Sequence, residues 1–346
     1  IDSKIKPRSF KKSEELLARS LKVIPSGTQT FSKGHTQFPV GASPLFLERG
    51  KGSHVWDVDG NEYIDYPLAL GPNILGYGNA AVDDAVIRQL KDGASFSLPH
   101  RLEVEVAEML VERIPCAQMV RFGKNGSDVT SAAVRLARAV TGRERIACCG
   151  YHGWQDWYIG TTTRSRGVPG AVRELTRAFE YNNLASLKAA LEAHPGQYAA
   201  VIMEPVGVIE PAPGFLEAVA AMAREHGALL IYDEIVTGFR MARGGAQELY
   251  KVTPDLACFG KALANGLPLA AIVGRADLMR VFDELFYSFT AGGEALSLAA
   301  AKATMLELDR LDAYPRLWKA GEMIRDGLNA LALRHGLKHR VHCFGP

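Results

Sequence analysis

The sequence predicts an α/β protein built on a mostly parallel β-sheet that helices cover on both faces. From residue 80 onward, helical stretches alternate with short, continuously apolar runs, as expected for strands that are buried on both faces. Several of these runs end in glycine, lysine or carboxylate residues. Because ligands bind beyond the carboxyl ends of such strands, the same pattern predicts where the functional site lies.

Helices are expected near residues 13–21, 80–92, 103–114, 128–140, 183–193, 214–226, 295–308 and 315–334. Strands of the sheet are expected at Met119–Phe122, Arg145–Cys149, Ala199–Met203, Ala228–Tyr232, Leu256–Phe259 and Leu269–Val273. Before them, residues 22–53 are rich in Gly, Pro, Ser and Thr and read as irregular. The stretch His54–Asp65 alternates on both sides of Asp59-Gly60 and predicts a β-hairpin.

Composition excludes several classes of function. The 346 residues are 47% hydrophobic and 23% charged, with a net charge of +2, which favours neither nucleic acid nor an anionic membrane as the partner. The sequence has no apolar stretch long enough to span a membrane, and its five cysteines have no C-x-x-C spacing. We therefore expect a cytoplasmic protein.

Lys261 and Asp233 are the most informative pair. Each follows an apolar run, and neighbouring buried strands would place both at one edge of the sheet. A lysine there can hold an aldehyde cofactor as a Schiff base, and a carboxylate can pair with a pyridine nitrogen. Taken alone, Lys261 could equally be a surface lysine and Asp233 a helix cap.

Three more motifs surround this pair. Asn125, Gly126 and Ser127 form a turn before a helix, where free N–H groups suit a phosphate, although a plain N-cap would look the same. Tyr151, within Gly150-Tyr-His-Gly-Trp154, could stack on a flat ring that Ile235 covers from the other side. Phe289-Thr290 precedes a further helix. Together these motifs describe a site for pyridoxal phosphate (PLP).

The chain resembles the class III, fold-type I PLP-dependent aminotransferases, and among them the glutamate-1-semialdehyde 2,1-aminomutases. The resemblance rests on these stretches: Asp57-Val-Asp-Gly-Asn-Glu-Tyr-Ile-Asp65, Tyr151-His-Gly153, Glu204-Pro-Val206, Asp233-Glu-Ile-Val-Thr-Gly-Phe-Arg240, Gly244-Gly-Ala-Gln247 and Gly260-Lys261. It covers nearly the whole chain. It implies a large PLP-binding domain at residues 67–308. It also implies a small α+β domain built from residues 1–66 and from 309–346, the latter being incomplete because the family continues beyond Pro346.

By this resemblance Lys261 and Asp233 are the catalytic residues, Lys261 forming the Schiff base. The cofactor-binding set implied by the resemblance is Asn125, Gly126, Ser127, Tyr151, His152, Glu204, Asp233, Ile235, Lys261 and Thr290. Thr290 would reach the cofactor phosphate of the neighbouring subunit, which implies a homodimer with shared active sites. No metal is expected, because Gly336 should end the helix between His335 and the pair His339 and His342.

The reaction implied is amino transfer from a small-molecule donor to a carbonyl acceptor through a pyridoxamine phosphate intermediate. Two departures from the aminomutases lie where substrates are selected. Ala69-Leu70 replaces a Ser-Trp pair, and the loop Gly207-Val-Ile-Glu-Pro211 is shorter and lacks an asparagine. An aminomutase, a PLP-dependent lyase and a catalytically silent PLP-fold protein stay open as alternatives, although Lys261, Asp233 and the phosphate turn together argue against the last.

Overall fold

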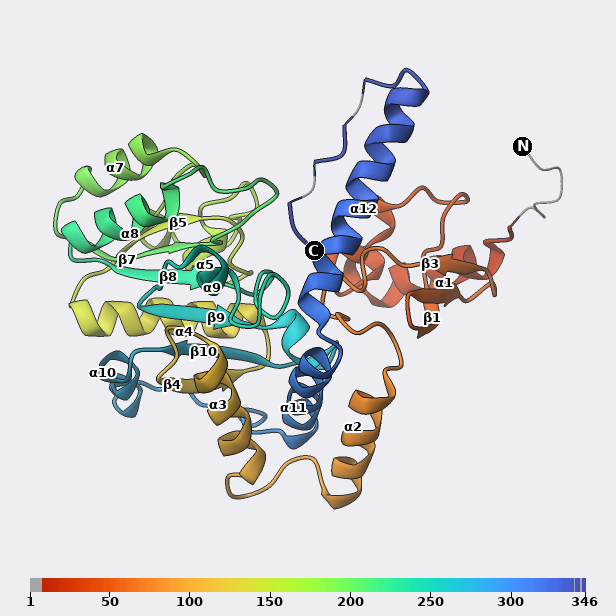
Figure 1. Ribbon diagram of the computed structural model, residues 1–346, viewed down its shortest axis with the longest axis horizontal. Coiled ribbons are helices and arrows are strands. Elements are labelled where there is room, and N and C mark those ends of the chain that lie inside the picture. The colour runs from red at the N-terminus through yellow and green to blue at the C-terminus, as the bar shows by residue number, and fades with distance from the viewer. Residues whose placement is uncertain (1–7, 339, 343) are drawn as a thin grey trace. The chain divides into compact units, whose positions relative to one another are not determined.

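The computed structural model describes residues 8–338, 340–342 and 344–346. It divides into two compact units, Ile1–Ala80 and Ala81–Pro346. Figure 1 shows the elements of both along the chain. In the part of the chain that the structure describes, no helix has the length and apolarity needed to cross a membrane.

The first unit contains a helix and a small antiparallel sheet. Its elements are α1 (Lys11–Val23), β1 (Leu47–Lys51), β2 (His54–Asp57) and β3 (Glu62–Ile64), with short 3₁₀ turns at Pro25–Gly27, Phe31–Lys33 and His35–Gln37. Strands β2 and β3 pair in antiparallel fashion, with His54 opposite Ile64, so the predicted hairpin is confirmed. The buried Asp57 carboxylate closes the turn by accepting the Asn61 N–H at 2.8 Å and the Tyr63 hydroxyl at 3.0 Å.

A tight turn follows the small sheet. Leu68, Ala69 and Leu70 have φ angles of 44°, 60° and 75°, a run of left-handed conformations without a glycine. Such conformations are disfavoured for residues with a Cβ. The turn is closed by the Leu70 N–H, which donates to the Pro67 carbonyl at 2.9 Å. The Ala69-Leu70 pair singled out in the sequence thus lies in strained backbone.

The second unit is built on a seven-stranded sheet in the order β4-β10-β9-β8-β7-β5-β6. Its strands are β4 (Met119–Gly123), β5 (Arg145–Cys149), β6 (Thr176–Ala178), β7 (Tyr198–Met203), β8 (Leu229–Asp233), β9 (Leu256–Phe259) and β10 (Ala270–Gly274). Only β10 runs against its neighbours β4 and β9, and the other pairs are parallel. The mostly parallel sheet is confirmed. The three-residue edge strand β6 was not expected, because so short a segment carries no periodicity.

Helices complete this unit. They are α2 (Ala80–Asp92), α3 (Arg101–Arg113), α4 (Gly126–Thr141), α5 (Asp156–Ile159), α6 (Gly170–Glu174), α7 (Leu184–Glu192), α8 (Phe215–Glu225), α9 (Ala246–Tyr250), α10 (Ala276–Met279), α11 (Ala295–Arg310) and α12 (Ala313–Arg334). The core packs α4 through Val129 and Ala133 against strand residues such as Ile202. The alternate residues, including Val201 and Tyr232, are also fully buried, so both faces of the sheet are covered. Figure 1 shows α8 beside β7 and β8, and α7 next to α8.

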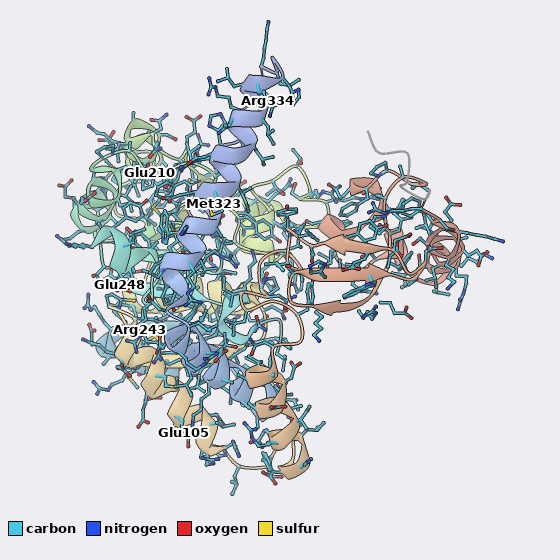
Figure 2. All side chains as sticks on the ribbon, turned by 45° about the vertical axis from the view of Figure 1, so that its right-hand side comes forward. Glu105, Glu210, Arg243, Glu248, Met323 and Arg334 are labelled. Carbon is cyan, nitrogen blue, oxygen red and sulfur yellow. The ribbon has the colours of Figure 1, made fainter. Side chains whose placement is uncertain are left out.

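Charged side chains fasten α3 to α11. Glu105 of α3 accepts Lys302 of α11 at 2.8 Å, and Arg243 bridges Glu112 at 3.0 Å and Asp309 at 3.4 Å. Figure 2 labels Glu105 and Arg243, two of the residues that make these contacts. The next helix, α12, is held differently, since the Trp318 indole N–H donates to the Met241 carbonyl at 2.7 Å. Further along α12, Met323 and Arg334 extend from the helix surface (Figure 2).

The loop after β8 is fixed by a buried carboxylate. Glu234 has no exposed surface and accepts the Ala246 N–H at 2.6 Å, the Thr237 hydroxyl at 2.7 Å and the Gln247 amide at 3.1 Å. Burial raises the pKa of Glu234, and these hydrogen bonds oppose that shift. The carboxylate therefore ties the end of β8, where Asp233 lies, to the start of α9.

Replacing Glu234 with alanine should lower the free energy of unfolding by about 3 kcal/mol, because several buried donors lose their acceptor at once. Urea unfolding followed by tryptophan fluorescence measures this loss. The exposed Glu225, changed to alanine, is the matched control and should leave the midpoint nearly unchanged. A loss below about 1 kcal/mol for Glu234→Ala would contradict the anchoring role.

Candidate active site

The candidate site lies at one edge of the large sheet. Strands β4, β5, β7, β8 and β9 point the same way, so their carboxyl ends meet at that edge. The residues at or just after these ends are Asn125, Gly126, Ser127, Tyr151, His152, Glu204, Asp233 and Lys261. Strands β8 and β9 are direct neighbours, and Asp233 pairs with Cys258, shortly before Lys261.

Lys261 begins a short 3₁₀ turn, Lys261–Ala264, with a φ of 41°. A lysine in this left-handed region is held there by its surroundings, a feature that often marks functional sites. Among the described residues its amine makes no hydrogen bond or ion pair. Burial lowers the pKa of Lys261, Glu204 and Asp233 partly restore it, and Arg240 lowers it further. The structure thus presents a partly desolvated amine whose pKa lies below its ordinary value.

Asp233 is 3% exposed and is held by two groups. Its Oδ2 lies 2.8 Å from His152 Nδ1, and its Oδ1 accepts the Ile235 N–H at 3.1 Å. His152 is fixed in turn, because its carbonyl accepts the Thr130 hydroxyl at 2.8 Å and its ring stacks on Trp157 at 6.0 Å between centroids. The His152 Nε2 atom is buried and has no partner within the described chain.

Ile235 and Tyr151 flank this region. Ile235 packs against two glycines, since a Cβ at Gly126 or Gly260 would lie 3.3 Å or 3.0 Å from its Cδ1. Tyr151 is 65% exposed, and its N–H donates to Glu204 Oε1 at 2.6 Å. Burial raises the pKa of Glu204, which the Tyr151 N–H opposes. Glu204 therefore positions the backbone that carries the Tyr151 ring.

The helix after β4 begins at Gly126, earlier than the expected start near residue 128. The reason is Asp128, whose carboxylate accepts the N–H groups of Asn125 at 2.8 Å and Lys124 at 3.1 Å. An acidic residue in the first turn that reaches back in this way is a capping device, and Asn125-x-x-Asp128 is its sequence signal. Asn125 therefore lies at the N-cap, and its N–H is already engaged.

The N–H groups of Gly126 and Ser127 have no partner among the described residues. The Ser127 hydroxyl accepts the Trp154 N–H at 2.9 Å, which leaves its own proton free to donate. Gly153 has a φ of 106°, and a side chain there would collide with Ser127. Free donors at the start of a 16-residue helix favour a bound anion.

Thr290 differs from the rest of the expected set. It is exposed on the loop before α11, and no hydrogen bond within the described residues joins it to the sheet edge.

Two features of the site were not predicted from the sequence. One is the proximity of Arg240 to Lys261, and the other is an ion pair of 2.9 Å between Lys124 and Glu294. Long-range pairs of this kind leave no local sequence signal.

Histidine, cysteine and acidic residues form no group suited to a metal ion in the described part of the chain. His335 follows α12, and the expected break there is observed, with Gly336 at a φ of 65°. His339 lies outside the described residues.

Comparison with known proteins identifies the family of this chain. Residues 37–345 match the family model of the class-III aminotransferases, so the chain belongs to that family. It is 43% identical over 310 residues to the 3-aminobutyryl-CoA aminotransferase of Cloacimonas acidaminovorans (strain Evry), covering 87% of this chain and 74% of the relative. It is 38% identical over 358 residues to glutamate-1-semialdehyde 2,1-aminomutase 2 of Bacillus cereus (strain AH820), covering 98% and 82%.

A solved structure shows the same fold with the cofactor. The PLP internal aldimine form of the Sphingopyxis sp. MTA144 FumI protein matches with a TM-score of 0.89 and 33% identity, covering 94% of this chain and 80% of that chain. The protein is thus a PLP-dependent class III aminotransferase of fold-type I, and it acts on small-molecule amino donors and carbonyl acceptors. Its residues fit the cofactor. Unpartnered N–H groups suit the phosphate, the buried Asp233 suits a protonated ring nitrogen, and the unpartnered Lys261 amine suits the aldehyde.

The charges around Lys261 predict how its reactivity depends on pH. Because the Glu204 carboxylate favours the ammonium form, Glu204→Gln should lower the Lys261 pKa, and cofactor-free protein should be labelled by an amine reagent at lower pH. Arg240→Gln should shift labelling to higher pH. Mass spectrometry of the Lys261 peptide after brief labelling across pH 6–10 measures both shifts. Identical curves for the two variants would refute the assignment of these neighbours.

Proposed function

We propose that Lys261 and Asp233 are the catalytic residues of an aminotransferase that exchanges an amino group between two separate small molecules. The observation that carries this proposal is the partly desolvated Lys261 amine, without a partner among the described residues, beside Asp233 and Glu204. PLP, when bound, supplies an aldehyde that condenses with amines and a ring that accepts electrons from the adjacent carbon. Proton movement and the positioning of the cofactor depend on side chains of this protein.

Lys261 is the proton carrier. With the cofactor bound, its amine in the neutral form would take up the proton of the donor carbon and deliver it to the cofactor side of the site. A lowered pKa increases the neutral fraction near neutral pH, which is the state a general base needs. Arg240 assists by disfavouring the ammonium form.

Asp233 keeps the ring nitrogen protonated. A carboxylate does this only if it is held in place facing the ring. The His152 contact and the Ile235 N–H supply the hydrogen bonds that hold it. Ile235 and Tyr151 would hold the two faces of the ring, and Gly126 and Ser127, with Asn125 at the N-cap, would hold the phosphate. Glu204 would orient Tyr151.

Transfer between two molecules is favoured over rearrangement within one. The loop Gly207–Pro211 is pinned at its far end, where the Asn182 side chain holds the Glu210 carbonyl and the Ala212 N–H. Its short exposed part carries Val208, which is 80% exposed, and no amide side chain. The loop therefore lacks the asparagine expected in an aminomutase, which favours transfer between two molecules. An amine on the third carbon of an acyl chain is the donor class to test first, because the 43%-identical relative is named for such a substrate.

A second copy of the chain completes the proposed assembly. Thr290 is exposed on its loop, and a groove of about 490 Å³ between α2, α3 and α11 is lined by Leu102 and Leu306 together with Arg88 and Arg101. Partly apolar, open surfaces of this kind are suited to subunit contact. We propose a homodimer in which Thr290 reaches the partner's cofactor phosphate.

We also propose a cytoplasmic location, in keeping with buried free thiols at Cys116, Cys148, Cys149 and Cys258.

Lys261→Ala should lower turnover at least about 10³-fold, because alanine has no amine to move the proton. The test titrates amino donors, including 3-aminobutyryl-CoA and glutamate 1-semialdehyde, and identifies products by mass. A released carbonyl product supports transfer between molecules, and a rearranged product without release supports the aminomutase. Ammonia release would indicate a lyase. Exposed Lys188→Ala is the control, and wild-type turnover by Lys261→Ala would rule out the assignment.

Sedimentation velocity should show a dimer for the wild-type protein. Leu306→Asp places a charge on the 52% exposed apolar side chain of α11 and should shift the population toward monomer. The comparison is Val23→Asp, which changes an 80% exposed side chain on α1 and should leave the dimer intact. A wild-type monomer, or equal dissociation of both variants, would contradict the proposed contact surface.

A further inference from the structure

The segment β4–α4 does more than form the phosphate turn. It also holds the loop 286–294, which carries Thr290, at both ends. At the start of the loop Arg135 donates to the Phe286 carbonyl at 2.8 Å, and Arg121 donates to the Tyr287 carbonyl. At the end of the loop, Lys124 pairs with Glu294.

Lys124 takes part in both the phosphate turn and the contact with the loop 286–294. Its main-chain N–H donates to Asp128 within the phosphate turn, while its ammonium lies 2.9 Å from Glu294 Oε2. Glu294 is in turn the cap of α11, because it accepts the Leu296 N–H and the Ser297 hydroxyl, the latter at 2.7 Å. One side-chain pair therefore links the start of α4 to the start of α11.

The pair is well placed to transmit order. The two side chains are 13% and 16% exposed, so solvent and salt screen their attraction less than at an open surface. Burial opposes the charge on Glu294, but the hydrogen bonds from Ser297 and Lys124 outweigh it and lower the Glu294 pKa. In the described residues it is the only ion pair between the β4–α4 segment and this loop.

We propose that Lys124 and Glu294 are positioning residues that couple the phosphate turn of one subunit to the Thr290 loop offered to its partner. The proposal rests on the proposed function, in which Thr290 binds the cofactor phosphate across the dimer. Breaking the pair frees one end of the loop and increases the conformational entropy that Thr290 loses on binding. Cofactor bound in the partner subunit is then held less tightly.

Cofactor loss tests the coupling directly. Lys124→Met and Glu294→Gln should each speed the loss of the visible cofactor band in PLP-free buffer by roughly fivefold, the effect of a partly buried ion pair. The double variant should be no worse than either single one, because both remove the same interaction. Lys124→Arg should retain near-wild-type loss. The melting temperature of the cofactor-free protein should change little, which separates positioning from general stability.

Hybrid dimers locate the effect. One subunit carries Glu294→Gln together with Lys261→Ala, which removes its own visible band, and its partner is wild type. Faster cofactor loss from the wild-type subunit supports coupling across the dimer. The reference hybrid carries Lys261→Ala alone. Equal loss from both hybrids, or additive effects of Lys124→Met and Glu294→Gln, would overturn the proposal.

Thr290→Ala separates this inference from the proposed function. If Thr290→Ala weakens cofactor retention and Glu294→Gln does not, the coupling is wrong and the threonine contact stands. If Thr290→Ala retains the cofactor as wild type does, the contact across the dimer is wrong, and the coupling falls with it. Weaker retention in both variants, with the trans effect in the hybrid, is the expected result.

Discussion

The main-chain ladder between β8 and β9 is the interaction on which the site depends. It sets Asp233 opposite Cys258 and so brings a carboxylate and the following Lys261 to the same edge of the sheet. A shift of one residue in this register would turn every side chain of the strand to the other face. Buried residues on both faces of the sheet make such a shift costly, because side chains of different size, each packed on its own face, would exchange places. The geometry of the candidate site is thus fixed by core packing.

Charge balance is the second constraint. Asp233 and Glu204 face the amine of Lys261, and Arg240 lies near enough to oppose them. Removing a charge from water is expensive, so specific donors hold both carboxylates: His152 and the Ile235 N–H hold the buried Asp233, and the Tyr151 N–H holds the partly buried Glu204. The same contacts that satisfy these charges also fix the groups that would surround the cofactor. Stability and preorganisation are supplied by one network.

Local patterns predicted most of the fold. Apolar runs located every strand of the large sheet except β6, and Asp59-Gly60 located the hairpin. The position of the site followed from the ends of the strands. Three features were not predicted from the sequence: the Lys124–Glu294 pair, the Arg240 neighbour of Lys261, and the earlier start of α4 that Asp128 causes. The last has a local signal, because an acid in the first turn of a helix marks a cap. The first two depend on the folded chain alone.

The reversed direction of β10 has a consequence for the size of the ligand. Since β10 lies between β4 and β9, two strand spacings of about 4.8 Å each, roughly 10 Å in all, separate the strand that leads to the anion-binding turn from the strand that leads to Lys261. Running the opposite way, β10 contributes only its beginning to this edge, where Ala270 lies opposite Gly123. The intervening strand therefore acts as a spacer. It sets the spacing between the two strand ends that a molecule would span if its anionic end rested on the helix and its other end lay beside Lys261.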